Sequence, residues 1–311
     1  MLFRSPLVDK LNKTGAALMQ LIYEEDARQV QKLMDDNDRY NRLRNIWREQ
    51  QNALEAALQA TSQFADKLDG MLNALNNTAD QLKNAEPIAA HPDRIQEQIR
   101  DNNAIINDLD QRAGAVEAIK SAAKDVISKA GKGDELAIRD IRKKLDKLND
   151  LWDEVQKNSK NRGRSLDDAL KVAEKFWNEL NNVMKAIRDL QDTLNNQEPP
   201  AAEPNEIKVQ QNQLNEIKHD IDQTKPEVDH CKQTGRNLMQ LCGEPDKPEV
   251  KKHIEDLDNA WDNVTSLFAK REQNLIEAME KAMNFHETLR NLLDFLDRAE
   301  RKYEGLGPIA E

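Results

Sequence analysis

The fold is decided by one stretch of sequence, residues 138–194, which reads IRDIRKKLDKLNDLWDEVQKNSKNRGRSLDDALKVAEKFWNELNNVMKAIRDLQDTL. Its inward positions recur at alternating steps of three and four, the spacing of a helix that packs as in a coiled coil. The positions of this seam are Ile138, Ile141, Leu145, Leu148, Trp152, Val155, Ser159, Arg162, Leu166, Ala169, Ala173, Phe176, Leu180, Val183, Ile187, Leu190 and Leu194. The pattern predicts one helix of about 60 residues.

A single helix-breaking residue, Gly163, interrupts this stretch, which contains no proline. A lone glycine costs a helix about 1 kcal/mol relative to alanine, and a helix of this length can absorb that cost. At about 1.5 Å per residue the helix would extend roughly 85 Å. Because a compact globule cannot contain such an element, the sequence predicts an elongated rod.

The composition favours long helices over a sheet. Charged residues make up 33% of the 311 residues, aromatic residues make up 4%, and Gly and Pro number ten each. Regular apolar spacing at this charge content also argues against disorder. The net charge of −11 argues against nucleic acid and anionic membranes as partners. The sequence lacks an apolar run long enough for a transmembrane helix, so no membrane insertion is expected.

The long seam belongs to an internal repeat. The interval from Phe64 to Phe176 is almost the same as the interval from Phe176 to Phe285. Each phenylalanine is followed by apolar residues at +4, +7, +8 and +11. The same two intervals separate three upstream aromatic residues, Tyr40, Trp152 and Trp261. A period of roughly 110 residues indicates an array of similar structural units.

Each period contains one long helix and one shorter return helix. The long helices are expected at about 26–83, at 138–194 and from 250 to a glycine-rich end at 305–308. The return helices are expected at about 93–130 and 205–242, after proline-containing breaks. Pro6, Gly114 and Pro226 are equivalent by the repeat spacing. We therefore expect a kink or a short break in the middle of each return helix.

This organisation resembles the spectrin repeat. The shared features are the length of the period, three helices per unit, and a third helix that continues into the first helix of the next unit. The phenylalanine of the first helix and the tryptophan of the third also look like that family's pattern. The second large aromatic residue usual in the first helix is kept by Phe295 but replaced by Ala74 and Ala186.

The linkers narrow the resemblance to the rod of spectraplakins, a family of giant cytolinkers. Five stretches carry it: HPDRI at 91–95, QEPPAAEP at 197–204, DQTKPEV at 222–228, GEPDKPEVKK at 243–252 and DNVT at 262–265. In such proteins the actin-binding domains lie far N-terminal and the microtubule-binding domain lies C-terminal. Neither motif is present here, so the resemblance implies only the role of the rod.

The implied fold is all-α: tandem spectrin repeats, each a three-helix antiparallel coiled-coil bundle, joined by continuous helices into an elongated rod. The three helices of a repeat are called A, B and C in chain order. Residues 1–59 are expected to form a partial repeat, with the end of helix B and a whole helix C. Complete repeats are expected at 60–170 and 171–280, and residues 281–311 as helix A of a following repeat. Both ends should then expose apolar seams, because repeats bury their cores against their neighbours.

The implied function is a non-enzymatic rod segment of a cytoskeletal linker. It would act in the cytoplasm as a spacer and docking surface for cytoskeletal and adaptor proteins, and reach actin and microtubules only through other domains. We expect a monomer as a fragment. Three alternatives stay open: a scaffold module for one specific partner, a rod of a dystrophin-like or nesprin-like protein, and head-to-tail pairing of the two end helices.

Candidate residues fall into two groups. The structural core is expected to include the aromatic residues Phe64, Trp152, Phe176, Trp261, Phe285 and Tyr40. A locally basic segment, with nine basic and five acidic residues between 139 and 164, is either an ordinary solvated face or a docking face for an acidic partner. Its candidate residues are Arg139, Arg142, Lys143, Lys144 and Lys147.

Three further expectations concern single side chains. Trp177 lies off the seam and is expected to cover the junction between two repeats, with an exposed contact to a partner as the alternative. Arg162 and Arg271 share one seam position, so their stems should pack while their guanidinium groups reach out near each junction. Cys231 and Cys242 lie three helical turns apart, too far for a disulfide, and are expected to be reduced core residues.

The sequence shows no arrangement typical of catalysis or of a cofactor. His286-Glu287 lacks the second histidine of a zinc-protease helix, and the acidic run from Asp35 lacks the glycine and the final glutamate of a calcium loop. Neighbouring His230 and Cys231 would point about 100° apart on a helix. We therefore expect no enzyme activity, no metal and no cofactor.

Overall fold

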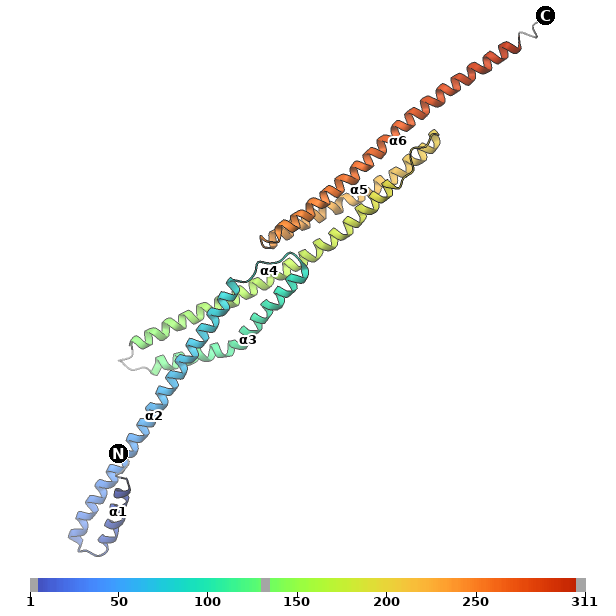
Figure 1. The fold of residues 1–311 in the computed structure, drawn as a ribbon. Coiled ribbons are helices and arrows are strands. Elements are labelled where there is room, and N and C mark those ends of the chain that lie inside the picture. The colour runs from blue at the N-terminus through green and yellow to red at the C-terminus, as the bar shows by residue number, and fades with distance from the viewer. Residues whose placement is uncertain (1–4, 130–134, 306–311) are drawn as a thin grey trace. The chain divides into compact units, whose positions relative to one another are not determined.

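The computed structural model describes residues 5–129 and 135–305. These residues form six helices and no strand (Figure 1). In chain order they are α1 (Ser5–Met19), α2 (Glu24–Lys83), α3 (Pro92–Lys129), α4 (Glu135–Asn195), α5 (Pro204–Leu241) and α6 (Lys247–Glu304). The single long helix predicted over 138–194 is confirmed as α4, and the all-α class is confirmed for the described residues.

The helix boundaries follow the break residues of the sequence. α5 and α6 both have proline in the first two positions, where the missing N–H would have no helical partner. α6 ends at Gly305, whose N–H donates to Arg301 O at 3.0 Å. The predicted end of the first return helix at 130 lies outside the described residues.

Gly163 does not interrupt α4. A Cβ at this position would lie 3.2 Å from Nδ2 of Asn102, so glycine leaves room for that amide beside the helix. Asn102 uses the space to donate a 2.9 Å hydrogen bond to Ser159 O. The glycine therefore serves helix packing, and its propensity cost is absorbed as expected.

The short break expected within the return helices is wrong. α3 continues through Gly114 and α5 continues through Pro226 as single helices. Both helices pack along their length against longer neighbours, and this packing outweighs the local loss of propensity or of one hydrogen bond. Pro6 is the second residue of α1, a first-turn position where proline is tolerated.

The chain divides into two compact units. Unit 1 comprises Met1–Ala79 and Gln111–Asp153, and unit 2 comprises Asp80–Asp110 and Glu154–Glu311. Helices α2, α3 and α4 each contribute residues to both units.

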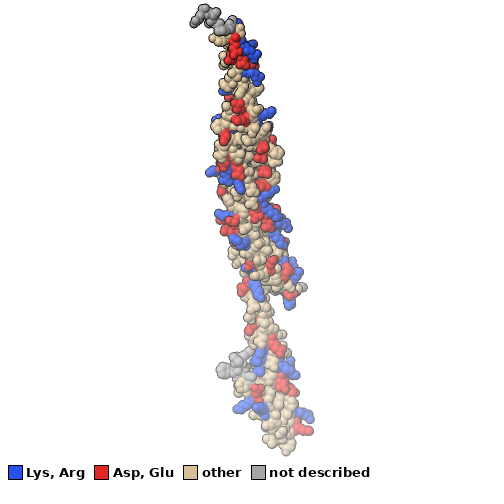
Figure 2. Space-filling model, turned by 90° about the vertical axis from the view of Figure 1, so that its right-hand side faces the viewer, with Lys and Arg blue, Asp and Glu red and all other residues tan. Residues whose placement is uncertain are grey.

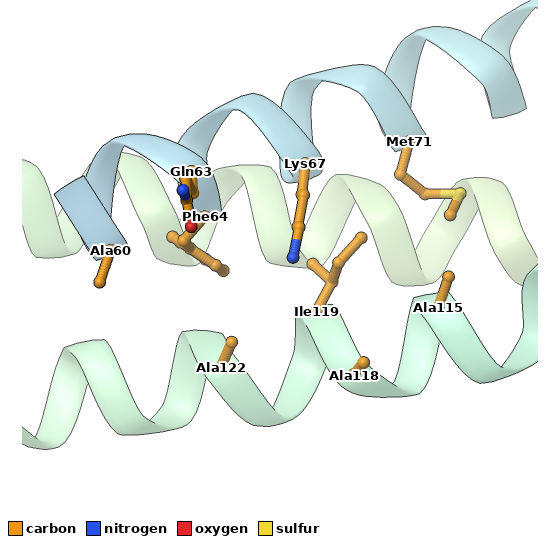
Figure 3. Close-up of a pocket in the computed structure, with 9 residues that line it drawn as sticks. All are labelled: Ala60, Gln63, Phe64, Lys67, Met71, Ala115, Ala118, Ile119 and Ala122. Carbon is orange, nitrogen blue, oxygen red and sulfur yellow. The ribbon is translucent and has the colours of Figure 1, made fainter.

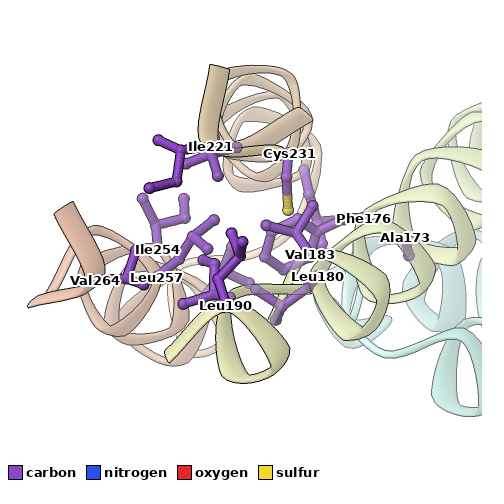
Figure 4. Packing of buried hydrophobic residues seen from close by; sticks show 14 of the residues in the cluster. Ala173, Phe176, Leu180, Val183, Leu190, Ile221, Cys231, Ile254, Leu257 and Val264 are labelled. Atoms are coloured by element: carbon purple, nitrogen blue, oxygen red, sulfur yellow. The ribbon is translucent and has the colours of Figure 1, made fainter. Parts of the chain in front are cut away.

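The core of unit 2 includes a bundle of α4, α5 and α6. Figure 4 looks along these three helices and shows their apolar side chains pointing into the space between them. The seam of α4 supplies Phe176, Leu180 and Ile187, all at most 5% exposed. α5 supplies Ile221 and Cys231, and the buried residues of α6 are Val250, Ile254, Leu257, Val264, Leu275 and Ala282.

The core of unit 1 is built by three helices in the same way. The buried residues of α2 are Phe64, Leu68, Met71, Leu72, Leu75 and Thr78. α3 adds Val116, Ile119 and Ala123, and α4 adds Leu148, Leu151 and Trp152. None of the described helices is both long and apolar enough to cross a membrane.

Candidate functional site

The most elaborate polar arrangement in unit 2 joins two turns. The first, residues 84–91, connects α2 to α3; the second, residues 242–246, connects α5 to α6. Gly243 N–H donates to Ile88 O at 2.7 Å. Ala90 N–H donates to Oδ2 of Asp246 at 2.8 Å. The two turns therefore interlock through backbone groups that would otherwise need water.

Trp177 seals this contact. Its indole Nε1–H donates to Ala90 O at 3.0 Å. His91 stacks on the indole with ring centroids 4.5 Å apart, and His253 meets it edge-on at 4.9 Å. His91 Nε2 lies 2.9 Å from Oε1 of Glu249, so the stack is tied to the first turn of α6. The prediction that Trp177 covers a junction is confirmed.

Two glycines make this close approach possible. A Cβ on Gly243 would overlap Cβ of Pro87, so any larger residue there would push the two turns apart. A Cβ on Gly235 would lie 2.7 Å from Phe176 Cε2 and 2.8 Å from Ile254 Cδ1. Gly235 thus lets α5 sit directly against the core beneath the junction.

The turn at 84–91 is held by a glutamine that recurs one repeat later. Gln98 of α3 accepts from Ala89 N–H at 3.0 Å and donates to Pro87 O at 2.8 Å. The same pair of bonds forms at the equivalent positions of the next repeat, where Gln210 accepts from Ala201 N–H at 3.0 Å and donates to Pro199 O at 2.9 Å. Sequence reasoning missed this clamp, although the shared spacing of glutamine and proline would have indicated it.

An arginine completes each clamp. Arg162 Nη2 donates to Glu86 O at 2.8 Å, and Arg271 Nη2 donates to Glu198 O at 2.7 Å. Arg271 also donates from Nε to Gln197 Oε1 at 2.9 Å. Burial lowers the pKa of both guanidinium groups from the usual value. Both arginine side chains are partly buried, and their guanidinium groups close the turns.

The six residues expected in the structural core differ in their surroundings. Phe64, Trp152 and Phe176 are buried, and Trp261 is partly buried against the core of unit 2. Two expectations need correction, because Tyr40 is 40% exposed and Phe285 is 64% exposed. Both occupy seam positions, but the described chain provides no complete set of neighbouring helices to cover them.

The five candidate residues of the basic segment lie near the start of α4, within unit 1. Arg139, Arg142, Lys143 and Lys147 are exposed. Lys144 differs, because its Nζ lies 3.0 Å from Asp69 and 3.5 Å from Asp140. Hydrogen bonding to Asp69 is the main cause that raises the pKa of Lys144. Figure 2 shows basic and acidic groups interspersed over the visible face rather than gathered by sign.

Both cysteines are free and buried, as expected from their separation. Burial and the nearby Glu179 raise the pKa of the Cys231 thiol to about 12. Burial is also the main cause that raises the pKa of Cys242. Such thiols are poor nucleophiles and poor ligands at neutral pH. Among the described residues, no group of three or more His, Cys, Asp or Glu side chains is placed to hold a metal ion.

The comparison with known protein families agrees with the helical bundles described above. The spectrin repeat family matches residues 59–168 and 171–277. The chain is also 32% identical over 305 residues to mouse Microtubule-actin cross-linking factor 1, isoforms 6/7, covering 98% of this chain and 9% of that protein. It is 31% identical over 308 residues to the human isoforms 6/7, again over 98% of this chain and 9% of the relative.

The rat Microtubule-actin cross-linking factor 1 gives 31% identity over 308 residues, with 98% of this chain and 6% of that protein covered. The chain therefore spans less than a tenth of the length of these relatives. The structure shows helical bundles with a repeated turn clamp. The family model matches the sequence over most of the chain. The chain belongs to the spectrin repeat family, and its repeats are similar in sequence to part of Microtubule-actin cross-linking factor 1.

Proposed function

We propose that this chain is a non-enzymatic rod segment of a giant cytoskeletal linker, acting as a spacer and docking surface in the cytoplasm. The names of its relatives describe cross-linking of microtubules and actin. We propose that this chain meets those filaments only through parts of the full-length protein outside it. Cytoskeletal and adaptor proteins would be its direct partners.

The observation that best supports a spacer is the interlock around Trp177. A spacer transmits position only if successive repeats resist rotation and separation. The contacts of Gly243 with Ile88 and of Asp246 with Ala90 join two turns that are far apart in the sequence. Backbone hydrogen bonds sealed by an aromatic stack hold such a contact more firmly than exposed ion pairs would.

The proposed division follows the repeat: a partial repeat at 1–59, complete repeats at 60–170 and 171–280, and helix A of a further repeat at 281–311. The clamps of Gln98 and Gln210, one repeat apart, support the equivalence of the two middle units. The proposal also includes the elongated rod and a monomeric state for this segment.

Small-angle scattering over a concentration series tests the spacer. We expect a constant maximum dimension of roughly 130–170 Å, given about 1.5 Å per helical residue in successive long helices. A dimension of about 60–70 Å would mean that the long helices fold back, and the spacer would be abandoned. A dimension that grows with concentration would contradict the monomer and favour pairing of the end helices.

A second candidate role is docking of an acidic partner on the basic segment of α4. Arg139, Arg142, Lys143 and Lys147 are exposed and form no ion pair among the described residues. Charge complementarity of this kind raises association rates and weakens with salt. The test is binding of a polyglutamate peptide to the chain and to Arg139→Glu/Lys143→Glu/Lys147→Glu. Equal binding by both proteins would remove this role.

A further inference from the structure

Unit 1 contains an apolar groove between α2 and α3 (Figure 3). It has a volume of about 470 Å³, within the range of sites that accept ligand side chains. The largely buried Phe64, Met71 and Ile119 line it at depth. Ala115 and Ala118 of α3 are exposed, so their small side chains leave the groove open.

The same groove recurs in unit 2 with opposite chemistry. Its lining includes Glu179, Glu227 and His230. By the repeat spacing, these three are the equivalents of Lys67, Ala115 and Ala118 in the first groove. Its volume is similar, about 480 Å³. The difference between the two grooves is therefore one of charge and polarity rather than of size.

In the groove of unit 2, the carboxylate of Glu179 has partners within the chain. Glu179 accepts a 3.0 Å hydrogen bond from the hydroxyl of Thr234 and lies 3.1 Å from Nδ1 of His230. Both partners come from α5, across the groove. In unit 1 the equivalents of His230 and Thr234 are Ala118 and Ala122, which offer no polar group.

Lys67 is consequently a cation without a counterpart. Figure 3 shows its side chain extending from α2 toward α3 beside Ile119. It is exposed and forms no ion pair among the described residues. An apolar surface with one unpaired cation at its edge is complementary to an amphipathic helix that carries an acidic residue beside its apolar face.

We propose that the groove of Phe64, Lys67, Met71, Ala115, Ala118 and Ile119 binds an amphipathic helix of a partner protein. The apolar face of that helix packs on Phe64, Met71 and Ile119, the alanines allow its backbone to approach α3, and its carboxylate pairs with Lys67. This inference rests on the docking half of the proposed function, but it concerns a different surface from the basic segment of α4.

The probe is a designed helical peptide with leucines at i, i+3, i+4 and i+7 and one glutamate beside them, titrated into the full chain. Methyl NMR signals of Met71 and Ile119 report binding at the groove. We expect Ala115→Glu/Ala118→His, which transplants the residues of the second groove, to weaken binding by about tenfold or more, a loss typical of a filled pocket.

A charge swap tests the role of Lys67. Lys67→Glu should weaken the glutamate peptide about threefold to tenfold and strengthen a matched peptide carrying lysine at the same position. Lys32→Glu, the same change of charge at an exposed position of α2 outside the groove, should leave both affinities unchanged. Because Lys67 and Lys32 are both exposed helix residues, circular dichroism is expected to show equal folding of the variants.

Three results would overturn the proposal: no shift of the Met71 and Ile119 methyl signals, equal peptide affinity for the native and transplanted grooves, or equal loss with Lys32→Glu. Shifts that follow the concentration of the chain alone would identify a second copy as the occupant and also overturn it. Failure here leaves the scattering result and the polyglutamate result intact, so the proposed function is tested separately.

Discussion

The regions around Trp177 and around His286 hold the same place in successive repeats but have different surroundings. Phe176 is fully buried beside Trp177, whereas Phe285 beside His286 is 64% exposed. Trp177 is enclosed by His91, His253 and the carbonyl of Ala90. His286 forms a single ion pair, 3.1 Å from Glu203, with both side chains partly exposed.

The difference in exposure between Phe176 and Phe285 shows that the covering turn, rather than the helix that carries the phenylalanine, decides whether the side chain is buried. His91 and Glu203 are equivalent by the repeat spacing, so both regions contain the turn of the preceding repeat. The region around Trp177 also receives the turn at 242–246 and the start of α6. No described segment plays that part beside Phe285. Burial of this position thus depends on the second and third helices of its own repeat as well as on the turn of the preceding repeat.

The largest change in stability is expected when each of the two phenylalanines is replaced by alanine. Phe176→Ala should destabilise the chain by about 3–5 kcal/mol, because it removes a ring from a closed core. Phe285→Ala should change stability by less than about 0.5 kcal/mol, as for most exposed positions. Urea unfolding followed by circular dichroism measures both. Similar losses for the two variants would show that Phe285 is covered in solution and would break the comparison.

The glycines of the covered junction give the next largest effect. Gly235→Ala should cost about 1–3 kcal/mol, because its Cβ would overlap Phe176 and Ile254. Gly243→Ala should also destabilise, since its Cβ would overlap Pro87.

Gly70→Ala and Gly114→Ala are the matched controls, because a Cβ at either position meets nothing within 4 Å. These helical positions should gain roughly 0.5–1 kcal/mol from the better helix propensity of alanine. Thermal melts of the four variants should therefore fall on both sides of the native protein. A neutral Gly235→Ala would mean that α5 can move away from the core at little cost.

The fold could be predicted because its signals are local and repeated. The three-four spacing along 138–194 determines helix α4, and the proline-containing breaks determine where helices begin. The short break considered at Gly114 and Pro226 does not occur, since packing along a long helix outweighs one weak position. The position of Trp177 off the seam allowed either a covered junction or an exposed partner contact, and its contacts with Ala90, His91 and His253 decide for the junction.

The interlock itself could not be predicted, because it joins residues that are distant in sequence through backbone atoms. Nothing in the types of Ile88 and Gly243 indicates that one accepts from the other. Phe285 shows a second limit of sequence-based prediction. The apolar spacing that follows it matches the spacing after Phe176, but such a pattern indicates which face of a helix is apolar and not whether a neighbouring helix covers that face. The clamp of Gln98 could have been predicted, since the equivalent glutamine, Gln210, occurs one repeat later in the sequence.

A smaller effect is expected at the indole nitrogen of Trp177. Trp177→Phe keeps an aromatic ring on His91 but leaves Ala90 O without its donor, at a cost of about 1 kcal/mol. Hydrogen exchange of the Gly243 amide should accelerate several-fold, because that N–H lies in the same interlock. His286→Phe, the equivalent change in the exposed region, should leave this amide unchanged. Unchanged exchange in Trp177→Phe would show that the backbone bonds hold the turns without the indole.

The last effect concerns the pH dependence of stability and tests how well water is kept from the covered core. The pKa of Cys231 rises to about 12 in the folded chain because burial and Glu179 disfavour the thiolate. The folded state therefore holds this proton more tightly than the unfolded state, whose thiol titrates near about 8.5. The resulting stabilisation is present below that pH and is lost as the pH rises toward 12. Lysines and tyrosines also titrate there, so the test is a difference: Cys231→Ala should flatten the fall of stability above about pH 9 relative to the native chain. An unchanged slope would mean that water reaches Cys231 beneath Gly235, and that the covered region opens more readily than its packing indicates.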